Sequence, residues 1–184
     1  MTTILIGAGG HAKIVYEIAE QNRINFDGFA DPKTLTFKEL KKLQEDDFYE
    51  LYFIGIGGVN VAQLEKRHAL HQNYKLNGSS SFRLLSPHAY VSQSAMIGYG
   101  TLVAHNAVIQ VDANIGENVI INTSAIIEHD AIIEDGAHIG PGAIVLGGAQ
   151  VGAMSMIGAG AVILPGQVVP AKTLVSSLTR YLND

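Results

Sequence analysis

The sequence contains no cysteine. Disulfide frameworks, thiolate-ligated zinc sites and cysteine nucleophiles are therefore excluded. Long apolar runs are absent as well, because none reaches the roughly 18 residues that a membrane-spanning helix requires. The first apolar segment also lacks the charged start and the cleavage site of a signal peptide. We therefore expect a cytoplasmic protein without a membrane span.

Basic residues are scarce. The chain has 12 Lys and Arg against 17 Asp and Glu, which gives a formal net charge of -5. Surfaces that bind nucleic acid normally carry a basic patch, so no nucleic-acid partner is expected. Charged residues make up 16% of the 184 residues and hydrophobic residues 47%, which is too apolar for a disordered chain. Such a chain hides much of its surface in a large core or against copies of itself.

The first 80 residues follow the pattern of a small α/β domain. An apolar segment, a glycine-rich turn and a stretch with apolar residues at helical spacing open the chain. The expected strands cover residues 3–6, 25–30 and 51–56, and the expected helices cover residues 12–21, 37–43 and 60–72. This order predicts a parallel sheet with crossover helices, a Rossmann-like domain over residues 1–80. The polar residues 77–81 mark its expected boundary.

A hexapeptide repeat begins at residue 85. An aliphatic residue returns every six positions without a shift of phase, at Leu85, Val91, Ile97, Val103, Ile109, Ile115, Ile121, Ile127, Ile133, Ile139, Val145, Val151, Ile157, Ile163 and Val169. Four residues after most of these stands a small residue such as Ala107 or Ala125. Neither a helical period nor the alternation of a strand produces this spacing, whereas a parallel β-helix does.

Each hexad is expected to form a short strand and a corner. The aliphatic residue fills the interior, the small residue fits where the chain turns inward, and three hexads close one triangular coil. Equivalent positions then recur every 18 residues, and neighbouring coils lie about 4.8 Å apart. Residues 81–184 are therefore predicted to form a β-helix of roughly five coils. Residues 173–184 are expected to end it as a short closing helix or tail.

Two groups of motifs resemble a known family. The hexads, for example residues 115–120 (Ile-Gly-Glu-Asn-Val-Ile), resemble those of the hexapeptide acyltransferase superfamily. Residues 4–13 (Ile-Leu-Ile-Gly-Ala-Gly-Gly-His-Ala-Lys), 29–32 and 56–58 resemble the sugar-binding domain of the NeuD/PglD-type sugar acyltransferases. Residues 121–130 (Ile-Asn-Thr-Ser-Ala-Ile-Ile-Glu-His-Asp) are similar to the active-site stretch of that family.

The resemblance implies an α/β Rossmann-like domain followed by a left-handed parallel β-helix. It also implies acetyl-CoA as a co-substrate and a nucleotide-activated sugar as the acceptor. Members of this family assemble as trimers, and acetyl-CoA lies in the cleft between adjacent β-helices. The expected partner is therefore a second copy of the chain, in a homotrimer with active sites between subunits.

Gly7, Gly9 and Gly10 end the first expected strand and open the first helix. Exposed N–H groups of a helix start attract phosphate there, and missing side chains let it come close. The full GxGxxG fingerprint is not present, because position 12 is alanine, and a tight strand-to-helix turn would need the same glycines. The resemblance implies that this loop holds the diphosphate of a nucleotide sugar and that His11 lines the same pocket.

Three more residues at the carboxyl ends of expected strands are predicted to contact the nucleotide sugar. Asp31 ends the second strand, where a carboxylate can accept hydrogen bonds from a base or a ribose. It can equally cap the turn before Pro32. Gly57 and Gly58 follow the third strand at the same edge of the sheet.

His129 matches the general base of the family, which removes a proton from a sugar amine or hydroxyl as that group attacks a thioester. An ordinary surface histidine is the alternative. Asp130 occupies the place of the orienting carboxylate, with Glu128 as the alternative. Strand neighbours point to opposite sides, so Asp130 reaches His129 only if the corner bends the chain. Asn122 matches another active-site position and is expected to hydrogen-bond the substrate, or else to serve as a corner residue.

His138 follows His129 by nine residues, which is half of an 18-residue coil. Half a coil places the two on roughly opposite sides of the prism and excludes a shared site within one chain. Around a threefold axis, His129 of one copy can face His138 of the next. The resemblance assigns His138, Gly147 and Ala159 to the acyl donor, with the N–H of Gly147 stabilising the oxyanion. A glycine at a coil corner also has a structural explanation.

The remaining histidines are expected to have no role. His68 and His71 lie on a polar helix face and are expected to be solvated, and His88 and His105 have no predicted partner. No metal site is expected, because the histidines lack ligand spacing. The segment 169–172 (Val-Pro-Ala-Lys) comes earlier than its counterpart in the family, so no residue is assigned to the adenine end of coenzyme A.

We interpret the chain as an acetyl-CoA-dependent N-acetyltransferase of a nucleotide-linked amino sugar, of the UDP-4-amino-4,6-dideoxy type, in bacterial surface glycan synthesis. O-acetylation of a sialic-acid-like sugar is the alternative within the family, and the sequence does not separate amine from hydroxyl acceptors. A non-catalytic trimeric β-helix that binds or scaffolds is the alternative from another class. His129, Asp130, Asn122 and the glycine loop argue against that alternative.

Overall fold

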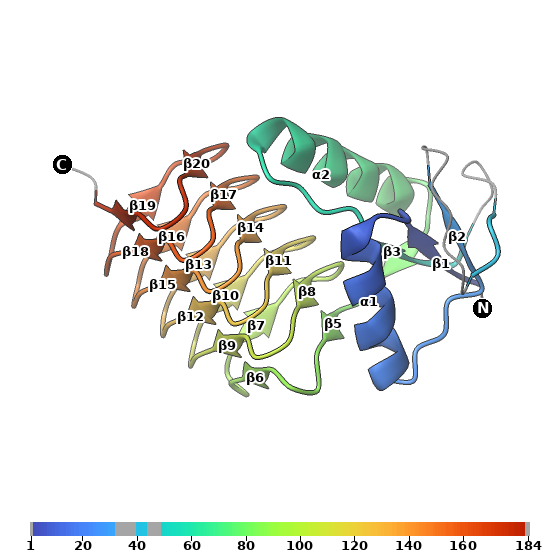
Figure 1. The fold of residues 1–184 in the computed structure, drawn as a ribbon, viewed down its shortest axis with the longest axis horizontal. Coiled ribbons are helices and arrows are strands. Elements are labelled where there is room, and N and C mark those ends of the chain that lie inside the picture. Colours follow the sequence, from blue (N-terminus) through green and yellow to red (C-terminus); the bar gives the residue numbers. More distant parts are fainter. Residues whose placement is uncertain (1, 32–39, 44–48, 183–184) are drawn as a thin grey trace.

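The computed structural model describes residues 2–31, 40–43 and 49–182. A small α/β part comes first, and a long stack of coils follows it (Figure 1). The elements of the first part are β1 (Thr3–Ile6), α1 (Gly10–Gln21), β2 (Gly28–Ala30), β3 (Leu51–Ile54), α2 (Val61–Leu76) and β4 (Ser80–Ser81). None of the helices in the described ranges is long and apolar enough to cross a membrane.

The first part contains a sheet of four parallel strands in the order β2-β1-β3-β4. Every residue of the central strand β1 is buried, because apolar clusters cover both faces of the sheet. Leu5 belongs to the cluster that contains Val15 of α1, whereas Ile4 belongs to the cluster that contains Tyr74 of α2. The expected parallel sheet with crossover helices is confirmed, and the carboxyl ends of its strands meet at one edge.

The helix expected over residues 37–43 is wrong for the part of it that the structure describes. Residues 40–43 run alongside β2: the N–H of Phe29 donates to the carbonyl of Lys41 (2.9 Å), and the N–H of Leu43 donates to the carbonyl of Phe29 (2.8 Å). These residues therefore extend the sheet edge, because β2 offers them unpaired backbone groups. Residues 37–39 lie outside the described residues.

The polar residues 77–81, expected to form a link, contain a strand. β4 pairs in parallel with β3 and so belongs to the first sheet. The chain leaves that sheet after Ser81 and enters the first coil at Leu84. A domain boundary at residue 80 stays a prediction.

The second part winds into coils whose two-residue strands stack in three parallel sheets. The β5 sheet contains β5 (Leu84–Leu85), β8 (Leu102–Val103), β11 (Ile120–Ile121), β14 (His138–Ile139), β17 (Met156–Ile157) and β20 (Leu174–Val175). The β6 sheet contains β6 (Tyr90–Val91), β9 (Val108–Ile109), β12 (Ile126–Ile127), β15 (Ile144–Val145), β18 (Val162–Ile163) and β21 (Arg180–Tyr181). The β7 sheet contains β7 (Met96–Ile97), β10 (Asn114–Ile115), β13 (Ile132–Ile133), β16 (Gln150–Val151) and β19 (Val168–Val169).

The hexapeptide period sets the register of these sheets. Ile109 pairs with Ile127, and Ile127 with Val145, so residues 18 positions apart lie side by side. All three are fully buried in one continuous core, as are the corner residues Ala125 and Ala143. The parallel β-helix with an aliphatic interior and small corner residues is confirmed.

The closing helix or tail expected over residues 173–184 is wrong for the residues up to 182, which wind on as a further coil. Val175 is buried, and Tyr181 packs against the core six positions later. The sequence pattern hides this coil because the second interior residue is aromatic and because the larger Thr173 and Thr179 stand at the small-residue positions.

The β5 sheet faces the first part of the chain. The outward side chains of its first three strands, Leu84, Leu102 and Ile120, are at most 1% exposed. They belong to the apolar cluster that also contains Val15 of α1 and Phe53 of β3. The α/β part therefore covers the beginning of this sheet, whereas Leu174 of its last strand β20 is exposed.

Helix α2 runs lengthwise along the coils (Figure 1). A Cβ at the corner residue Gly100 would lie 2.7 Å from Cε1 of His71, so the helix packs closely there. One coil further on, Arg67 donates a hydrogen bond to the backbone carbonyl of Asn118. A helical turn rises about 5.4 Å and coils are about 4.8 Å apart. Residues one turn apart on α2 therefore contact successive coils.

Candidate active site

His129 lies at the corner between β12 and β13. The corner is a tight turn in which the N–H of Ala131 donates to the carbonyl of Glu128 (3.3 Å) and Asp130 has a left-handed backbone (φ 59°). This conformation brings Oδ2 of Asp130 to 2.8 Å from Nδ1 of His129. The corner thus bends the usual alternation of side chains, and Asp130 is the carboxylate that hydrogen-bonds the histidine.

The carboxylate of Asp130 fixes the tautomer of His129. A carboxylate only accepts hydrogen bonds, so Nδ1 carries the proton and Nε2 keeps its lone pair. This hydrogen bond raises the pKa of His129 above its usual 6.5. Both side chains are exposed, His129 at 59% and Asp130 at 65%. Nε2 can therefore remove a proton from a group that reaches this corner.

Gly147 occupies the same corner position as His129, one coil further along. The N–H of Ala149 donates to the carbonyl of Leu146 (3.0 Å) and closes its turn. A Cβ at Gly147 would lie 2.7 Å from Nε2 and from Cε1 of His129, so glycine leaves the room that the imidazole needs. The backbone of Gly147 thus lies beside the basic nitrogen. The expected role of the Gly147 N–H, donation to an oxyanion, stays a prediction.

Asn122, at the corner that follows β11, and His138 of β14 form a second polar pair. Nδ2 of Asn122 lies 3.0 Å from Nε2 of His138, and Oδ1 of Asn122 accepts from the N–H of Thr123 (2.8 Å). On the other side of the ring, Nδ1 of His138 lies 2.7 Å from the carbonyl oxygen of Gly58. The structure thus joins Asn122 to His138 within one chain, and both to the expected sugar-binding loop.

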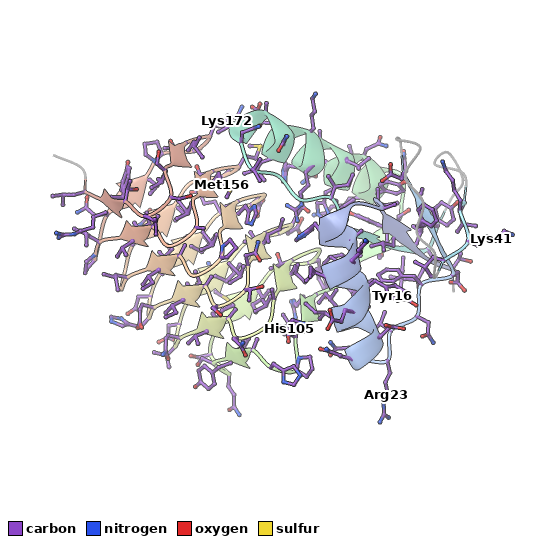
Figure 2. All side chains as sticks on the ribbon, in the orientation of Figure 1. Tyr16, Arg23, Lys41, His105, Met156 and Lys172 are labelled. Carbon is purple, nitrogen blue, oxygen red and sulfur yellow. The ribbon has the colours of Figure 1, made fainter. Side chains whose placement is uncertain are left out.

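A groove of about 560 Å³ begins at this pair and follows the coils to the last one. Residues that line it include Val59, Asn122, His138, Met156, Ala159 and Ser177. Met156 lies on β17, near the middle of this stretch (Figure 2). Asn122 and Ser176 are three coils apart, so the His138 groove extends over roughly 14 Å. It contains two of the three residues that were assigned to the acyl donor.

The glycine loop after β1 is open above the start of α1. A Cβ at Gly9 or Gly10 would meet nothing within 4 Å, and α1 begins without a side-chain cap. Gly7 has a positive φ of 110°, and a Cβ there would lie 2.8 Å from Cγ1 of Ile56, so the backbone itself requires this glycine. Uncapped N–H groups below open space can bind an anion.

Asp31, Gly57 and His11 lie around this loop. Oδ2 of Asp31 accepts from the N–H of Ala8 (2.6 Å), and the aspartate is buried, so it holds the glycine loop in place. A Cβ at Gly57 would lie 3.3 Å from Cβ and Cγ of His11, which packs over it. The sequence-predicted residues of the first domain are therefore gathered at one sheet edge, while their contacts with a nucleotide sugar stay predictions.

Arg67 is a buried cation that the sequence did not predict. It is 1% exposed, and within the described residues its Nε and Nη2 have no hydrogen-bond partner. Burial lowers the pKa of Arg67 to about 9. Burial and, to a smaller extent, the charge of Arg67 lower the pKa of His138 to about 4 and that of His11 to about 3. Arg67 escaped prediction because α2 presents polar residues on the face that it buries.

The expectation that His71 is solvated is wrong, and His68 is half-buried. His71 is 1% exposed, and its Nδ1 lies 3.0 Å from the hydroxyl of Tyr52. Both histidines face the coil corners under α2, where Gly100 and Gly136 leave room for the rings. Contacts with residues so distant in sequence leave no local signal.

His105 has partners that the sequence did not predict. Its Nδ1 lies 2.7 Å from Oγ of Ser86, and its ring packs against that of His88, with centroids 5.8 Å apart.

In the part of the chain that the structure describes, no group of three His, Asp or Glu side chains could hold a metal ion.

The sequence and the fold both match known proteins. Residues 3–64 match the model of the PglD N-terminal domain. Residues 112–147 and 130–165 match the model of the bacterial transferase hexapeptide (six repeats). No curated protein sequence matches the chain significantly.

Solved structures match over the length of the chain. A mutant of perosamine N-acetyltransferase from Caulobacter crescentus, in complex with CoA and GDP-perosamine, has a TM-score of 0.92 and 27% identity over 100% of this chain and 90% of that chain. The acetyltransferase domain of PglB from Neisseria gonorrhoeae has a TM-score of 0.89 and 26% identity over 100% of this chain and 92% of that one. A PglD N-terminal domain followed by hexapeptide repeats, in a fold shared with these acetyltransferases, confirms the resemblance to the NeuD/PglD-type sugar acyltransferases.

In this sugar acyltransferase the predicted site residues fall into three groups. His129 and Asp130 stand at one corner over Gly147. Asn122 and His138 stand at the head of the groove that Ala159 lines. The residues of the first domain gather near the glycine loop, and the hydrogen bond between Gly58 and His138 links them to the groove.

Proposed function

We propose that this acyltransferase moves the acetyl group of acetyl-CoA to the amine of a nucleotide-linked amino sugar, of the UDP-4-amino-4,6-dideoxy type, in bacterial surface glycan synthesis. The observation that carries the proposal is the pairing of His129 with Asp130, which leaves Nε2 basic and exposed beside Gly147. The similar perosamine N-acetyltransferase, solved with GDP-perosamine, supports an amine acceptor. A binding protein or scaffold would have no use for such a base.

The acceptor is expected at the glycine loop. Gly9 and Gly10 leave the start of α1 open, and this helix of 12 residues directs positive potential at an anion there. A diphosphate placed on that helix start would hold the nucleotide at the sheet edge. The sugar would then extend past His11 and Gly57 toward the coils.

The donor is expected in the His138 groove. Its length of roughly 14 Å, three coil spacings, suits an extended pantetheine arm that lies parallel to the coil axis. The thioester end would stand near Asn122 and His138, and the other end near Ser176 and Ser177 of the last coil. The additional coil would thus offer contacts at the adenine end, to which the sequence assigned no residue.

The two catalytic corners lie on opposite edges of the β6 sheet. Asn122 stands at the corner where the chain enters this sheet, and His129 at the corner where it leaves. The outward side chains of the sheet include Val108, Ile126 and Ile144, which stand in register as an apolar stripe. Packing three such stripes around a threefold axis brings the His129 edge of one copy to the Asn122 edge of the next. The proposal therefore includes a homotrimer with active sites between subunits.

His129 is the general base of the proposed reaction. Its Nε2 accepts a proton from the sugar amine while the amine nitrogen bonds to the acyl carbon, and Asp130 stabilises the imidazolium that forms. The N–H of Gly147 donates to the oxyanion of the tetrahedral intermediate. His129 then returns the proton to the sulfur as the C–S bond breaks, so the products are an amide and a free thiol.

Thiol release tests this function. We expect turnover when acetyl-CoA is incubated with UDP-linked or GDP-linked 4-amino sugars, and none with sialic acids. His129→Ala should lower the rate by roughly 10²–10⁴-fold without changing the oligomer, while His88→Ala, at an exposed histidine, should leave it unchanged. Turnover with sialic acids alone would replace the proposal with O-acetylation. No turnover with any acceptor would favour the scaffold reading.

A further inference from the structure

His138 connects the two parts of the chain through its ring. The side chain is 5% exposed, yet both ring nitrogens have hydrogen-bond partners. Nδ1 lies 2.7 Å from the carbonyl oxygen of Gly58 in the first part, and Nε2 lies 3.0 Å from Nδ2 of Asn122 at the head of the groove. No ring nitrogen is left over to contact an acyl donor.

The direction of each hydrogen bond in the series from Gly58 through His138 to Asn122 follows from which partner can donate. A carbonyl only accepts, so Nδ1 of His138 carries the proton, and neutral Nε2 must accept from the amide N–H of Asn122. The amide oxygen of Asn122 then faces the N–H of Thr123, 2.8 Å away. The carboxamide of Asn122 is thereby held in one orientation. A charged ring would donate from both nitrogens and oppose the Asn122 amide, and burial together with the charge of Arg67 keeps the pKa of His138 low, at about 4.

We propose that His138 is a positioning residue, which ties the orientation of Asn122 in the groove to the place of the Gly58 loop in the first domain. The inference rests on the proposed function. It assigns His138 neither proton transfer nor donor binding: the ring acts through Asn122. A shift of the loop by a bound sugar nucleotide would move the same carboxamide.

Two substitutions of His138 separate this role from others. His138→Gln keeps one donor and one acceptor at a similar separation, although glutamine cannot titrate near neutral pH. His138→Phe keeps the ring but loses both hydrogen bonds. We expect His138→Phe to lower kcat by on the order of 100-fold, as a misplaced group does, with KM for acetyl-CoA little changed, and His138→Gln to recover most of that loss. His88→Gln is the matched control and should behave as wild type.

The other end of the connection can be changed independently. A Cβ at Gly58 would lie 2.7 Å from Cδ2 of the buried Leu64, so Gly58→Ala must displace the loop or that side chain. We expect Gly58→Ala to lower kcat, Leu64→Val to restore it in the double variant, and the effects of Gly58→Ala and His138→Phe to be non-additive. Additive effects, or a His138→Gln enzyme as slow as His138→Phe, would overturn the inference.

A spectroscopic measurement keeps this inference distinct from the proposed function. The nitrogen-15 shifts of His138 in the ligand-free protein should report a neutral ring with the proton on Nδ1, and Gly58→Ala should change them. If the wild type releases no thiol with any acceptor, the proposed function fails while this readout still stands. If the wild type is active but the ring is protonated on Nε2, only the inference fails.

Discussion

Nε2 of His129 lies so close to Gly147 that a Cβ at position 147 would be 2.7 Å from it. The two residues occupy the same corner position in successive coils, so the imidazole of one coil packs against the backbone of the next. The position of the His129 imidazole at this corner therefore depends on residue 147 being glycine.

Gly147→Ala should displace the imidazole of His129. The added methyl group needs the space of the ring, and a displacement of about 1 Å costs on the order of 100-fold in rate. Steady-state thiol release checks kcat, and thermal unfolding checks the fold. In a His129→Ala background the same methyl group should have almost no effect on stability, because the ring it meets is gone. A stability loss of equal size in both backgrounds would contradict the contact.

The reaction should lose rate on the acid side. His129 must be neutral to accept a proton, and Asp130 raises its pKa above 6.5. Activity is therefore full above that raised pKa and falls as the pH drops through it. Asp130→Asn should move this limb to lower pH and lower the plateau by roughly 10²–10⁴-fold, because the tautomer is no longer fixed.

Asp112→Asn is the matched control for that profile. Asp112 has the same left-handed backbone (φ 57°) at the equivalent corner one coil earlier, but a valine precedes it. Its pH profile should equal that of the wild type. If the activity of Asp130→Asn falls at the same pH as that of the wild type, Asp130 does not raise the pKa of His129.

Mixing two inactive variants should restore activity. In a trimer, a site takes His129 from one copy and Asn122 from the next, so His129→Ala and Asn122→Ala copies that assemble together form some intact sites. Random mixing in equal amounts should rebuild about a quarter of them. Thiol release after co-refolding measures this recovery. His129→Ala mixed with Asp130→Asn should recover nothing, since both residues come from one corner, and recovery in that control would contradict a site between copies.

Acid should destabilise the fold before it protonates the carboxylates. The pKa values of His138 and His11 fall to about 4 and about 3 in the folded chain, below the ordinary 6.5. Between these values the unfolded chain binds protons that the folded chain does not, so the free energy of unfolding is full above pH 6.5 and falls as the pH drops. Urea unfolding from pH 8 to 5 measures the slope. His11→Gln should make the slope shallower, and an unchanged slope would contradict a buried neutral His11.

The coils could be predicted because every interior residue meets the same environment. Ile109, Ile127 and Val145 each fill one layer of the same core, so local spacing alone fixes their burial. The geometry of the corner at His129 could be predicted in part as well. Asn and Asp adopt left-handed backbone more readily than most residues, and Asn106, Asp112, Asn118 and Asp130 all do so here at repeat corners. That signal could have predicted the bend that brings Asp130 to His129.

The interface between the two parts could not be predicted in this way. Arg67 and His71 look like solvent-facing residues of a polar helix, and only the coil corners at Gly100 and Asn118 make them buried. Those corners follow 29 or more residues later in the chain. The hydrogen bond between Gly58 and His138 spans 80 residues. Contacts between residues so far apart in sequence depend on how the folded α/β part packs against the folded coils. Neither segment alone carries that information.

The repeat of corner geometry means that the backbone does not single out one coil for chemistry. Asp112 already adopts the left-handed backbone that Asp130 uses. The N–H of Asp130 donates to the carbonyl of Val111, just as the N–H of Gly148 donates to the carbonyl of His129 one coil later. A histidine at position 111 with a glycine at 129 would transplant the reactive pair by one step of about 4.8 Å. In such a β-helix, evolution can move a catalytic centre along the coil axis by two substitutions, and no new loop is needed.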